Sequence, residues 1–581
     1  MSDVSPAAAN LPRRKWLDRG LLVATLLTCA VALSPGVADP DLWGHVQYGR
    51  DALRDGLPAT TTHSFTAIGY PWINHENIAE LLLAYGADAC GPIGMLIGKS
   101  LLGVGLVALV LWNARRQQAG MLSGCLVALL VAINLTYFWT LRPQVLSFVW
   151  YTLLLALAAW CFAGWEGVGR VPWLRSWQKA APDVPPLTWS ASRLRLLWFT
   201  PVLFALWTNS HGGFVAGWCI WIAYLCGRAA EAWFAKGRAA LGVIVQFALL
   251  IAACGLATLV NPYGFELHRW LFADLLPPRP EILEWRAPEM LSTTMLPFWL
   301  IVVTFVAALL LTRRSCDVTH LMILVLTAWQ SFLHVRHIPF FALAFGFWMV
   351  VHVDSTLRHF RIVSDAETLP SMGARMRRAL VVAMAAAYLV LGVKLATRWG
   401  QLTVDRAEYP VSAVQYVADQ GLRGRMVVTF NWAQYVIDAL GAKAPHESAI
   451  QVSFDGRFRT SYSQEIADMN FDFILGPLEP RYRSSTTQFD DERVLDHGHP
   501  DLVLINRYQP HSVNVMFRQR DRWTLLYQDK IAQLWGRSTV FGDPAQPTFI
   551  PVHHRRISES PQTGLVSWPA YPRRDQVAAR E

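Results

Sequence analysis

Long apolar stretches separated by short polar segments dominate the chain from its N-terminus to about residue 400. A helix needs about 20 apolar residues to cross the hydrocarbon layer of a membrane, so each stretch predicts a transmembrane helix. The two stretches that flank TNSHGGF also fit one broken or re-entrant unit. The eleven predicted spans cover 19–38, 93–112, 121–138, 145–164, 196–209, 214–228, 241–260, 294–312, 319–334, 338–353 and 379–397.

The pattern changes after residue 400, where shorter apolar segments alternate with polar ones. YPVSAVQYVADQGL predicts a helix, GRMVVTFNWAQYVIDAL predicts a strand, a turn and a helix, and PDLVLINR predicts another strand. RWTLLYQDKIAQLWGR has the alternation of a hairpin centred on Asp529. We therefore predict a small α/β domain over 401–542, followed by an irregular tail over 543–581 that is rich in proline and arginine.

The composition supports a membrane protein, with 53% hydrophobic residues, 16% charged residues and a mean hydropathy of +0.27. A net charge of +9 would suggest a nucleic-acid partner for a soluble chain, but here arginine and lysine gather in alternate short loops. The positive-inside rule therefore explains the charge, and it predicts that residues 1–18 and these basic loops are cytoplasmic. An odd number of spans then places the C-terminal domain outside. The eight cysteines are scattered without a CxxC motif, which predicts neither a zinc site nor a disulfide framework.

Clusters of polar and ionisable residues fall on the opposite, outer side. The first outer loop, 39–92, contains DPDLWGH and WINHENIAE, and two of its segments predict short amphipathic helices lying on the membrane surface. Ionisable groups at the membrane boundary are costly to bury, so their presence indicates a function. This segregation predicts a site that faces outward, at the rim of the membrane.

Asp39 and Asp41 are the first candidates for catalysis. One carboxylate can accept the proton of an incoming hydroxyl as general base, while the other orients it or holds a divalent cation such as Mg or Mn. The structural alternative is that Asp-Pro-Asp only caps a helix. A cap needs one aspartate, however, and His45 follows Asp41 after one turn.

The other candidates are predicted to bind substrate or phosphate. Each has a structural alternative, such as a snorkelling arginine or a tight glycine turn. Three potentially cationic groups in HVRHIP suit a polyanion such as a phosphate. The candidates are His45, His75, Glu76, Arg142, Gln144, Asn209, His211, His334, Arg336 and His337. Weaker candidates in the fourth outer loop are Tyr263, His268, Glu281 and Glu284, and no pair has the spacing of a zinc motif.

The chain has no GxGxxG after a strand and no GxxxxGK[ST], which argues against a nucleotide-binding domain. Chemistry on the outer face then requires a donor that is already there, and a lipid-linked donor meets this condition. A transporter or flippase of lipid-linked glycans is an alternative, but we find no convincing internal repeat. A non-catalytic scaffold with a periplasmic binding domain is a second alternative.

The order of these motifs resembles the GT-C superfamily of polytopic glycosyltransferases, which includes oligosaccharyltransferases and protein O-mannosyltransferases. DPD, residues 39–41, lies where these enzymes carry acidic residues, in the first outer loop after the first span. DLWGH, NHE, LRPQ, NSHGGF, NPYG and VRHIP resemble motifs of a bacterial branch of largely unassigned function. The resemblance covers the membrane region, about 19–400.

The resemblance implies a multi-pass enzyme of the bacterial inner membrane. It would transfer a sugar or glycan-type group from a polyprenyl-phosphate donor to a lipid, glycan or protein acceptor. Asp39 or Asp41 would act as general base or orient the acceptor, and Arg336 with His334 or His337 would neutralise the departing polyprenyl phosphate. Residues of the C-terminal domain that bind the acceptor, or merely pack that domain, are Asn431, Trp432, Tyr435, Asp455 and Arg457.

Overall fold

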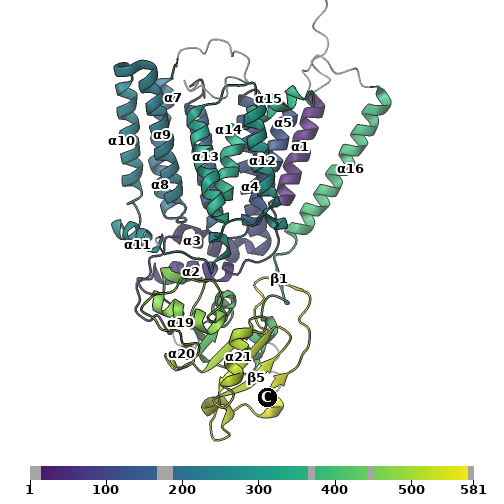
Figure 1. The fold of residues 1–581 in the computed structure, drawn as a ribbon. Helices are drawn as coiled ribbons and strands as arrows, with labels where there is room; N and C mark the ends of the chain where they lie inside the picture. The colour runs from purple at the N-terminus through teal and green to yellow at the C-terminus, as the bar shows by residue number, and fades with distance from the viewer. Residues whose placement is uncertain (1–14, 166–186, 276, 364–372, 442–449, 574–581) are drawn as a thin grey trace, which may run out of the picture.

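A computed structural model describes residues 15–165, 187–275, 277–363, 373–441 and 450–573 of the chain. Its upper part consists of helices that stand side by side, and its C-terminal domain lies below one end of them (Figure 1). The predicted fold class, a helical membrane protein with a C-terminal α/β domain, is confirmed. The helices of the upper part are α1 (Lys15–Ala32), α4 (Gly91–Arg116), α5 (Met121–Leu135), α6 (Gln144–Cys161), α7 (Ala191–Arg195), α8 (Thr200–Thr208), α9 (Phe214–Lys236), α10 (Leu241–Ala257), α12 (Leu296–Leu311), α13 (Val318–Leu333), α14 (Ile338–Trp348), α15 (Val350–His359) and α16 (Ala374–Trp399).

Six helical stretches in the described residues are long and apolar enough to cross a membrane, or seven if the bent pair α14 and α15 forms one span. The chain is therefore a multi-pass membrane protein, while the count of eleven spans stays a prediction. One of the six stretches, Phe214–Ala257, contains α9 and α10, which pack against each other. The chain reverses between them at Gly237, whose φ of +52° favours glycine.

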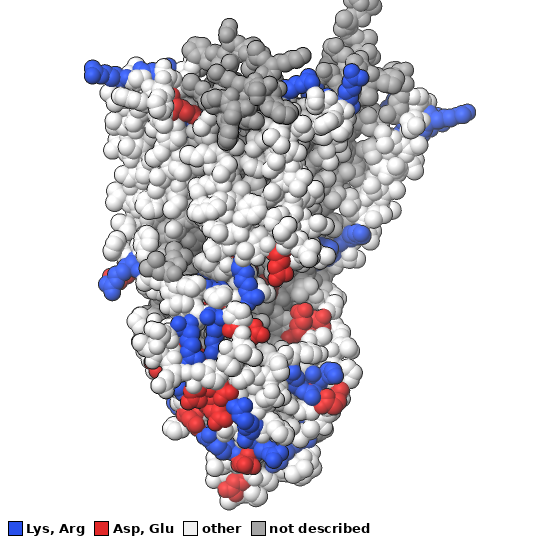
Figure 2. All heavy atoms as spheres, viewed as in Figure 1, with Lys and Arg blue, Asp and Glu red and all other residues white. Residues whose placement is uncertain are grey.

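Charge follows the same division of the molecule. On the face shown in Figure 2, the middle of the helical part is almost free of charged side chains, which gather at its ends and on the C-terminal domain. This is the surface that a hydrocarbon layer requires, because a charged side chain in contact with lipid tails is costly.

Two short helices cross the lower end of the helical part, α2 (Leu42–Asp55) and α3 (Asn77–Tyr85) (Figure 1). They correspond to the two amphipathic helices predicted in the first outer loop. A π-helical turn, Gly86–Cys90, joins α3 to α4. A third helix in this layer, α11 (Phe265–Leu275), comes from the fourth outer loop. These helices separate the spans from the C-terminal domain.

The C-terminal domain is built on a six-stranded sheet in the order β3-β2-β4-β6-β5-β7. Strands β2, β3 and β4 are parallel, and β6 is antiparallel to both β4 and β5. The predicted hairpin around Asp529 is therefore confirmed as β5 and β6. The strands are β2 (Gly424–Val428), β3 (Ile450–Val452), β4 (Leu502–Asn506), β5 (Trp523–Gln528), β6 (Ala532–Arg537) and β7 (Arg556–Ile557).

Helices cover both faces of this sheet, so its central strand is apolar on both sides. In β4, Leu502 and Leu504 belong to one buried cluster, and Val503 and Ile505 belong to the other. This explains the continuous run LVLI in the sequence, because a strand buried on both faces does not alternate with polar residues. The helices are α17 (Val411–Asp419), α18 (Ala433–Leu440), α19 (Gln464–Leu475), α20 (Arg493–Asp496) and α21 (Pro510–Arg518).

The tail, which we predicted to be irregular, contributes two short strands. Strand β7 pairs with β5, and β8 (Leu565–Ser567) pairs with β1 (Thr403–Asp405) near the end of α16. The tail also returns to the first outer loop, where the Trp43 indole donates a hydrogen bond of 2.9 Å to the Pro569 carbonyl. Regular hydrogen bonding here comes from docking onto the folded domain, which local composition does not reveal.

The C-terminal domain is fastened to the membrane part through α2. The ring of Trp43 packs against Tyr409 and Tyr435, at centroid distances of 5.0 and 5.1 Å. Two turns after Trp43 in α2, Arg50 forms an ion pair of 3.1 Å with the buried Asp438 of α18. Buried aromatic pairs contribute more than their area alone, so this contact holds the two parts in one arrangement.

Candidate active site

A cavity of about 460 Å³ lies between the lower end of the helical part and the C-terminal domain. Its wall is formed by the first outer loop, the start of α6, the turn between α8 and α9, the end of α13 and the loop after β3. Ten of the twelve predicted site residues line it: Asp41, His45, His75, Glu76, Arg142, Gln144, His211, His334, Arg336 and His337. The fold thus gathers motifs that are separated by up to about 300 residues in the sequence.

Arg142 joins both aspartates of the first outer loop. Its guanidinium donates a hydrogen bond of 2.6 Å to Asp39, a second to Asp41 and a third, of 2.8 Å, to Glu284. Pro143 follows it at the start of α6, so Arg142 lies where the helix begins and its side chain is free to turn outward. In this structure Arg142 therefore pairs with carboxylates of the protein itself, and its role toward substrate or phosphate stays a prediction.

The two aspartates have different surroundings. Asp39 is 9% exposed, and one of its oxygens accepts both Arg142 and the backbone N–H of Asp41, at 3.0 Å. Asp41 lines the cavity, and its side chain is 27% exposed. Asp41 precedes α2 but makes no side-chain capping hydrogen bond, so capping does not explain it. Enclosure raises the pKa of Asp41, Arg142 opposes this rise, and Asp39 adds to it.

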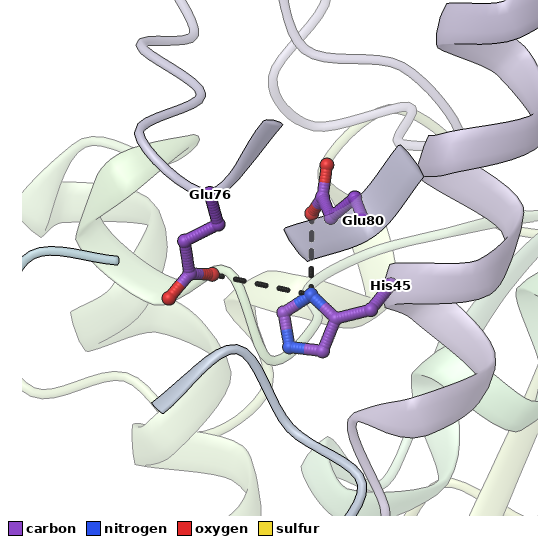
Figure 3. A group of neighbouring side chains, drawn as sticks. All are labelled: His45, Glu76 and Glu80. Carbon is purple, nitrogen blue, oxygen red and sulfur yellow. Dashed lines mark hydrogen bonds and ion pairs between the residues drawn. The ribbon is translucent and has the colours of Figure 1, made fainter. Parts of the chain in front are cut away.

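A divalent cation does not fit between Asp39 and Asp41 in this arrangement, because the guanidinium of Arg142 fills the space between the carboxylates. Only one other group in the described residues has suitable ligand atoms close together, namely His45, Glu76 and Glu80, all within 4.8 Å of one another (Figure 3). The sequence did not single out Glu80. It lies four residues after Glu76, and this spacing puts both carboxylates on one face of α3.

His45 binds the two glutamates. Its Nδ1 lies 3.2 Å from Glu80 and 3.9 Å from Glu76, as the dashed lines in Figure 3 mark. Burial disfavours the charged imidazole, but the hydrogen bond with Glu80 and the charges of Glu76 and Asp41 outweigh it and raise the pKa of His45 to about 9. His45 is therefore cationic at neutral pH, and it compensates the acidic side of the cavity.

His211 faces Glu76 from the opposite wall. Its Nδ1 accepts a hydrogen bond of 3.0 Å from the Gly213 backbone and lies 2.8 Å from the Ser147 hydroxyl. Burial lowers the pKa of His211 to about 3, with Glu76 opposing this effect. The ring is therefore neutral, and its Nε2–H points to Glu76 at 3.6 Å. Burial also opposes the charged form of Glu76, yet the surrounding histidines and Arg142 outweigh it and lower its pKa.

The HVRHIP motif forms the last wall. A short 3₁₀ turn, Val335–His337, follows α13, and His334 donates from Nδ1 to the Trp285 carbonyl at 2.7 Å. The Arg336 guanidinium lies over the Trp285 ring, 4.4 Å from its centre. Among the described residues Arg336 has no ion-pair or hydrogen-bond partner. Among the arginines that line the cavity, Arg142 is therefore neutralised by carboxylates, whereas Arg336 has no carboxylate partner among the described residues.

The remaining predicted residues have mainly structural contacts. Asn209 lies outside the cavity wall, where its amide donates to the carbonyls of Ala205 and Val260 at 2.8 and 2.7 Å. Gln144 donates a long hydrogen bond of 3.4 Å to the Phe138 carbonyl. Glu284, a weaker candidate, is joined to the two aspartates through its hydrogen bond with Arg142. The other three weaker candidates, Tyr263, His268 and Glu281, do not line the cavity.

One wall of the cavity comes from the C-terminal domain, which our sequence analysis did not connect to the aspartates. Gln434, Gly456, Phe458 and Thr460 line it, with Arg457. Arg457 forms two hydrogen bonds with Asp455, of 2.9 and 2.7 Å, and one of 2.6 Å with the Thr62 carbonyl. It also stacks on Tyr48 and Trp72, so Arg457 joins the domain to the first outer loop. Asp455 and Arg457, which our sequence analysis named as residues that bind the acceptor or pack the domain, were the signal for this contact.

The fold has counterparts among solved structures. An oligosaccharyltransferase from Archaeoglobus fulgidus, tethered to an acceptor peptide with the NVT sequon, has a TM-score of 0.50 and 10% identity, over 85% of this chain and 69% of that one. The apo form of that enzyme has a TM-score of 0.50 and 10% identity, over 86% of this chain and 70% of that one. ArnT from Cupriavidus metallidurans bound to undecaprenyl phosphate has a TM-score of 0.46 and 12% identity, over 93% of this chain and 100% of that one. The predicted GT-C resemblance is thus confirmed for the fold. The sequence matches no protein-family model and no curated protein.

Proposed function

We propose that the protein is a glycosyltransferase that moves a sugar or glycan-type group from a polyprenyl-phosphate donor to an acceptor on the periplasmic face of a bacterial inner membrane. The observation that carries the proposal is the cavity itself. It lies at the end of the helical part next to the C-terminal domain, and it holds a partly exposed carboxylate, Asp41, and an arginine, Arg336, that has no carboxylate partner among the described residues. These are the two charges that transfer from a lipid phosphate requires.

Asp41 is the better general base of the two aspartates. Both carboxylates accept from Arg142, but Asp41 lines the cavity, whereas Asp39 does not and also accepts from the Asp41 backbone N–H. In the proposed reaction the acceptor nucleophile loses its proton to the Asp41 carboxylate and forms a bond with the anomeric carbon of the sugar. The bond between that carbon and the phosphate oxygen breaks. Asp39 and Arg142 hold Asp41 in the orientation that this step needs.

Arg336 is placed to receive the leaving group. The polyprenyl phosphate gains negative charge as its bond to the sugar breaks, and a fixed cation near that oxygen stabilises the charge. The Arg336 guanidinium is not neutralised by another described residue, so it is available to a phosphate. His334 and His337 lie on either side of it in the same turn, and both line the cavity. No step in this mechanism runs through a metal.

The test is a reconstituted assay with defined donors. Purified full-length protein in liposomes receives a panel of undecaprenyl-phosphate-linked sugars, and we measure sugar transfer or release to water together with movement of the donor between leaflets. We expect transfer or release with at least one donor, and its loss in Asp41→Asn. Movement of donors without any transfer would replace this proposal by a flippase. Reporter fusions after residues 36 and 399 test the outer location of the site, and a cytosolic reporter at either position contradicts it.

A further inference from the structure

Gln434 of the C-terminal domain lies directly against Asp41. It belongs to the first turn of α18 and is only 3% exposed. Its amide lies 3.0 Å from Oδ1 of Asp41, 3.1 Å from the Asp41 carbonyl and 3.2 Å from the Pro40 carbonyl. All three are oxygens that only accept hydrogen bonds, so the amide nitrogen must be the atom that faces them. Gln434 therefore donates to the segment that carries the proposed base.

Two glycines make room for this contact. A Cβ at Gly456 would lie 2.5 Å from Oδ1 of Asp41 and 2.6 Å from the Gln434 amide. A Cβ at Gly44 would lie 2.6 Å from the amide carbon of Gln434. Neither glycine has a positive φ, so the backbone does not require glycine at either position. What requires it is the close approach of Gln434 to Asp41, with one glycine from each side of the domain boundary.

The contact is rigidly supported. Next to Gln434 in α18, Tyr435 packs on Trp43 of α2, and Asp438 pairs with Arg50 one turn further along. Both helices therefore hold their first turns at a fixed separation. A donor on one helix and an acceptor before the other can then keep hydrogen-bond geometry without help from solvent.

We propose that Gln434 is a positioning residue for Asp41, and that Gly44 and Gly456 are glycines because they admit it. The C-terminal domain then completes the catalytic site instead of only binding an acceptor. Other charged groups that face Asp41 are Arg142, Asp39, His45 and Glu284. Of these only Arg142 donates to its side chain, at the oxygen opposite to the one that Gln434 binds. The two donors together fix the plane of the carboxylate.

A double-mutant cycle on the full-length chain tests the contact without any substrate. We measure the apparent thermal midpoint in nanodiscs for Gln434→Leu, Asp41→Ala and the double variant, because alanine at position 41 removes the acceptor oxygen that asparagine would keep. If Gln434 donates to Asp41, the decreases in thermal midpoint of the two single variants are not additive, because either substitution alone already breaks the hydrogen bond. We expect the double variant to lose less than the sum of the singles. Additive losses overturn the proposal. Gln415→Leu, whose amide binds Asp419 and Arg573 elsewhere in the same domain, is the matched control and must be additive with Asp41→Ala.

The glycine prediction is tested in the same cycle. Gly456→Ala places a methyl between the two partners, so we expect the coupling of Gln434 and Asp41 to fall to zero in that background. Gly392→Ala, in α16, has open space around it and must leave the coupling unchanged. Coupling that survives in Gly456→Ala overturns the steric role of the glycine.

The contact between Gln434 and Asp41 does not depend on the function proposed above, but its role in catalysis rests on that function. In the liposome assay Gln434→Leu should lower kcat about 10-fold and leave the KM of the donor within about twofold, because the donor phosphate lies at Arg336. A raised KM with an unchanged kcat contradicts positioning. If no donor is ever transferred, the proposed function fails, while the cycle still decides whether Gln434 holds Asp41.

Discussion

Two clusters among the described residues, one around Arg228 and one around Arg142, each join an arginine to more than one carboxylate, and they differ in exposure. In the helical part, Arg228 of α9 pairs with Glu231 at 2.8 Å and with Asp317 at 2.7 Å, and it also bonds with His320 and Tyr224. At the cavity, Arg142 pairs with Asp39, Asp41 and Glu284. The Arg228 side chain is 1% exposed, whereas that of Arg142 is 22% exposed.

The difference teaches how to separate a structural cluster from a reactive one. The Arg228 cluster is the closed one, because Arg228 and Glu231 are buried, and its charges serve to hold α9 and α13 together. The Arg142 cluster is the open one, because Asp41 faces a cavity that also contains Arg336, which has no ion-pair partner among the described residues. The same residue types therefore carry out different tasks, and access from the cavity decides which.

The largest effect is expected at the open cluster. Asp41→Asn removes the proposed base but keeps the size of the side chain, so transfer should fall by about 10³-fold to 10⁴-fold with little change in stability. The measurement is the initial rate of sugar transfer in liposomes. Asp55→Asn, at the exposed end of α2, is the control and should retain full activity. Full activity in Asp41→Asn would show that the open cluster is not catalytic.

At the closed cluster the loss should appear in stability. Arg228→Gln leaves the buried Glu231 and the half-buried Asp317 without their cation, which costs about 3–5 kcal/mol of unfolding free energy. Denaturant unfolding in micelles measures this loss. Arg238→Gln, an exposed arginine that follows α9, should cost almost nothing. If Arg228→Gln is as stable as Arg238→Gln, the closed cluster has no structural role.

Arg336→Gln sharpens the role of the open side. It keeps hydrogen-bond donors but removes the charge that stabilises the leaving phosphate, so kcat should fall by about 10²-fold to 10³-fold. Single-turnover kinetics with an undecaprenyl-phosphate sugar isolate this step. The fold should survive, because Arg336 makes no ion pair with a described residue. An unchanged kcat would contradict the assignment of the phosphate to Arg336.

The smallest effect concerns pH. The pKa of His45 is raised in the fold from 6.5 to about 9, so the folded state holds this proton more tightly than the unfolded chain. Its contribution, about 2–3 kcal/mol, is complete below about pH 6.5 and is lost as the pH rises to about 9. Unfolding between pH 6 and 9 should therefore show a decline that His45→Gln flattens and His553→Gln, at an exposed position, does not. Parallel curves for wild type and His45→Gln would contradict it.

The sequence predicted much of the fold because the signals are local. The apolar stretches, the surface helices α2 and α3, and the hairpin around Asp529 all follow from periodicity within short windows. Ten of the predicted residues lie around one cavity, and most of them could be singled out because ionisable groups at a membrane boundary are rare unless they are used. The pairing of β8 with β1 could not be predicted, since it joins segments about 160 residues apart.

What the sequence did not reveal is how the two parts dock. Gln434 stands in an ordinary amphipathic helix, and Gly456 stands in a loop, so neither pattern indicates contact with Asp41. Glu80 was missed although its motif was noted, because its role appears only when His45 is brought opposite to it by the packing of α2 on α3. Contacts between distant segments depend on tertiary structure, and one sequence does not encode them visibly.

The most direct test of the central claim is the binding of undecaprenyl phosphate to the intact protein, because the cavity must bind the lipid phosphate whatever the sugar and acceptor are. Native mass spectrometry of three proteins measures it: wild type, Arg336→Gln and Arg313→Gln, the last at an exposed arginine beyond α12. We predict that Arg336→Gln weakens binding at least about 10-fold, as expected for the loss of a charge-assisted hydrogen bond, and that Arg313→Gln binds like wild type. Equal binding by wild type and Arg336→Gln, or a loss confined to Arg313→Gln, would contradict the account.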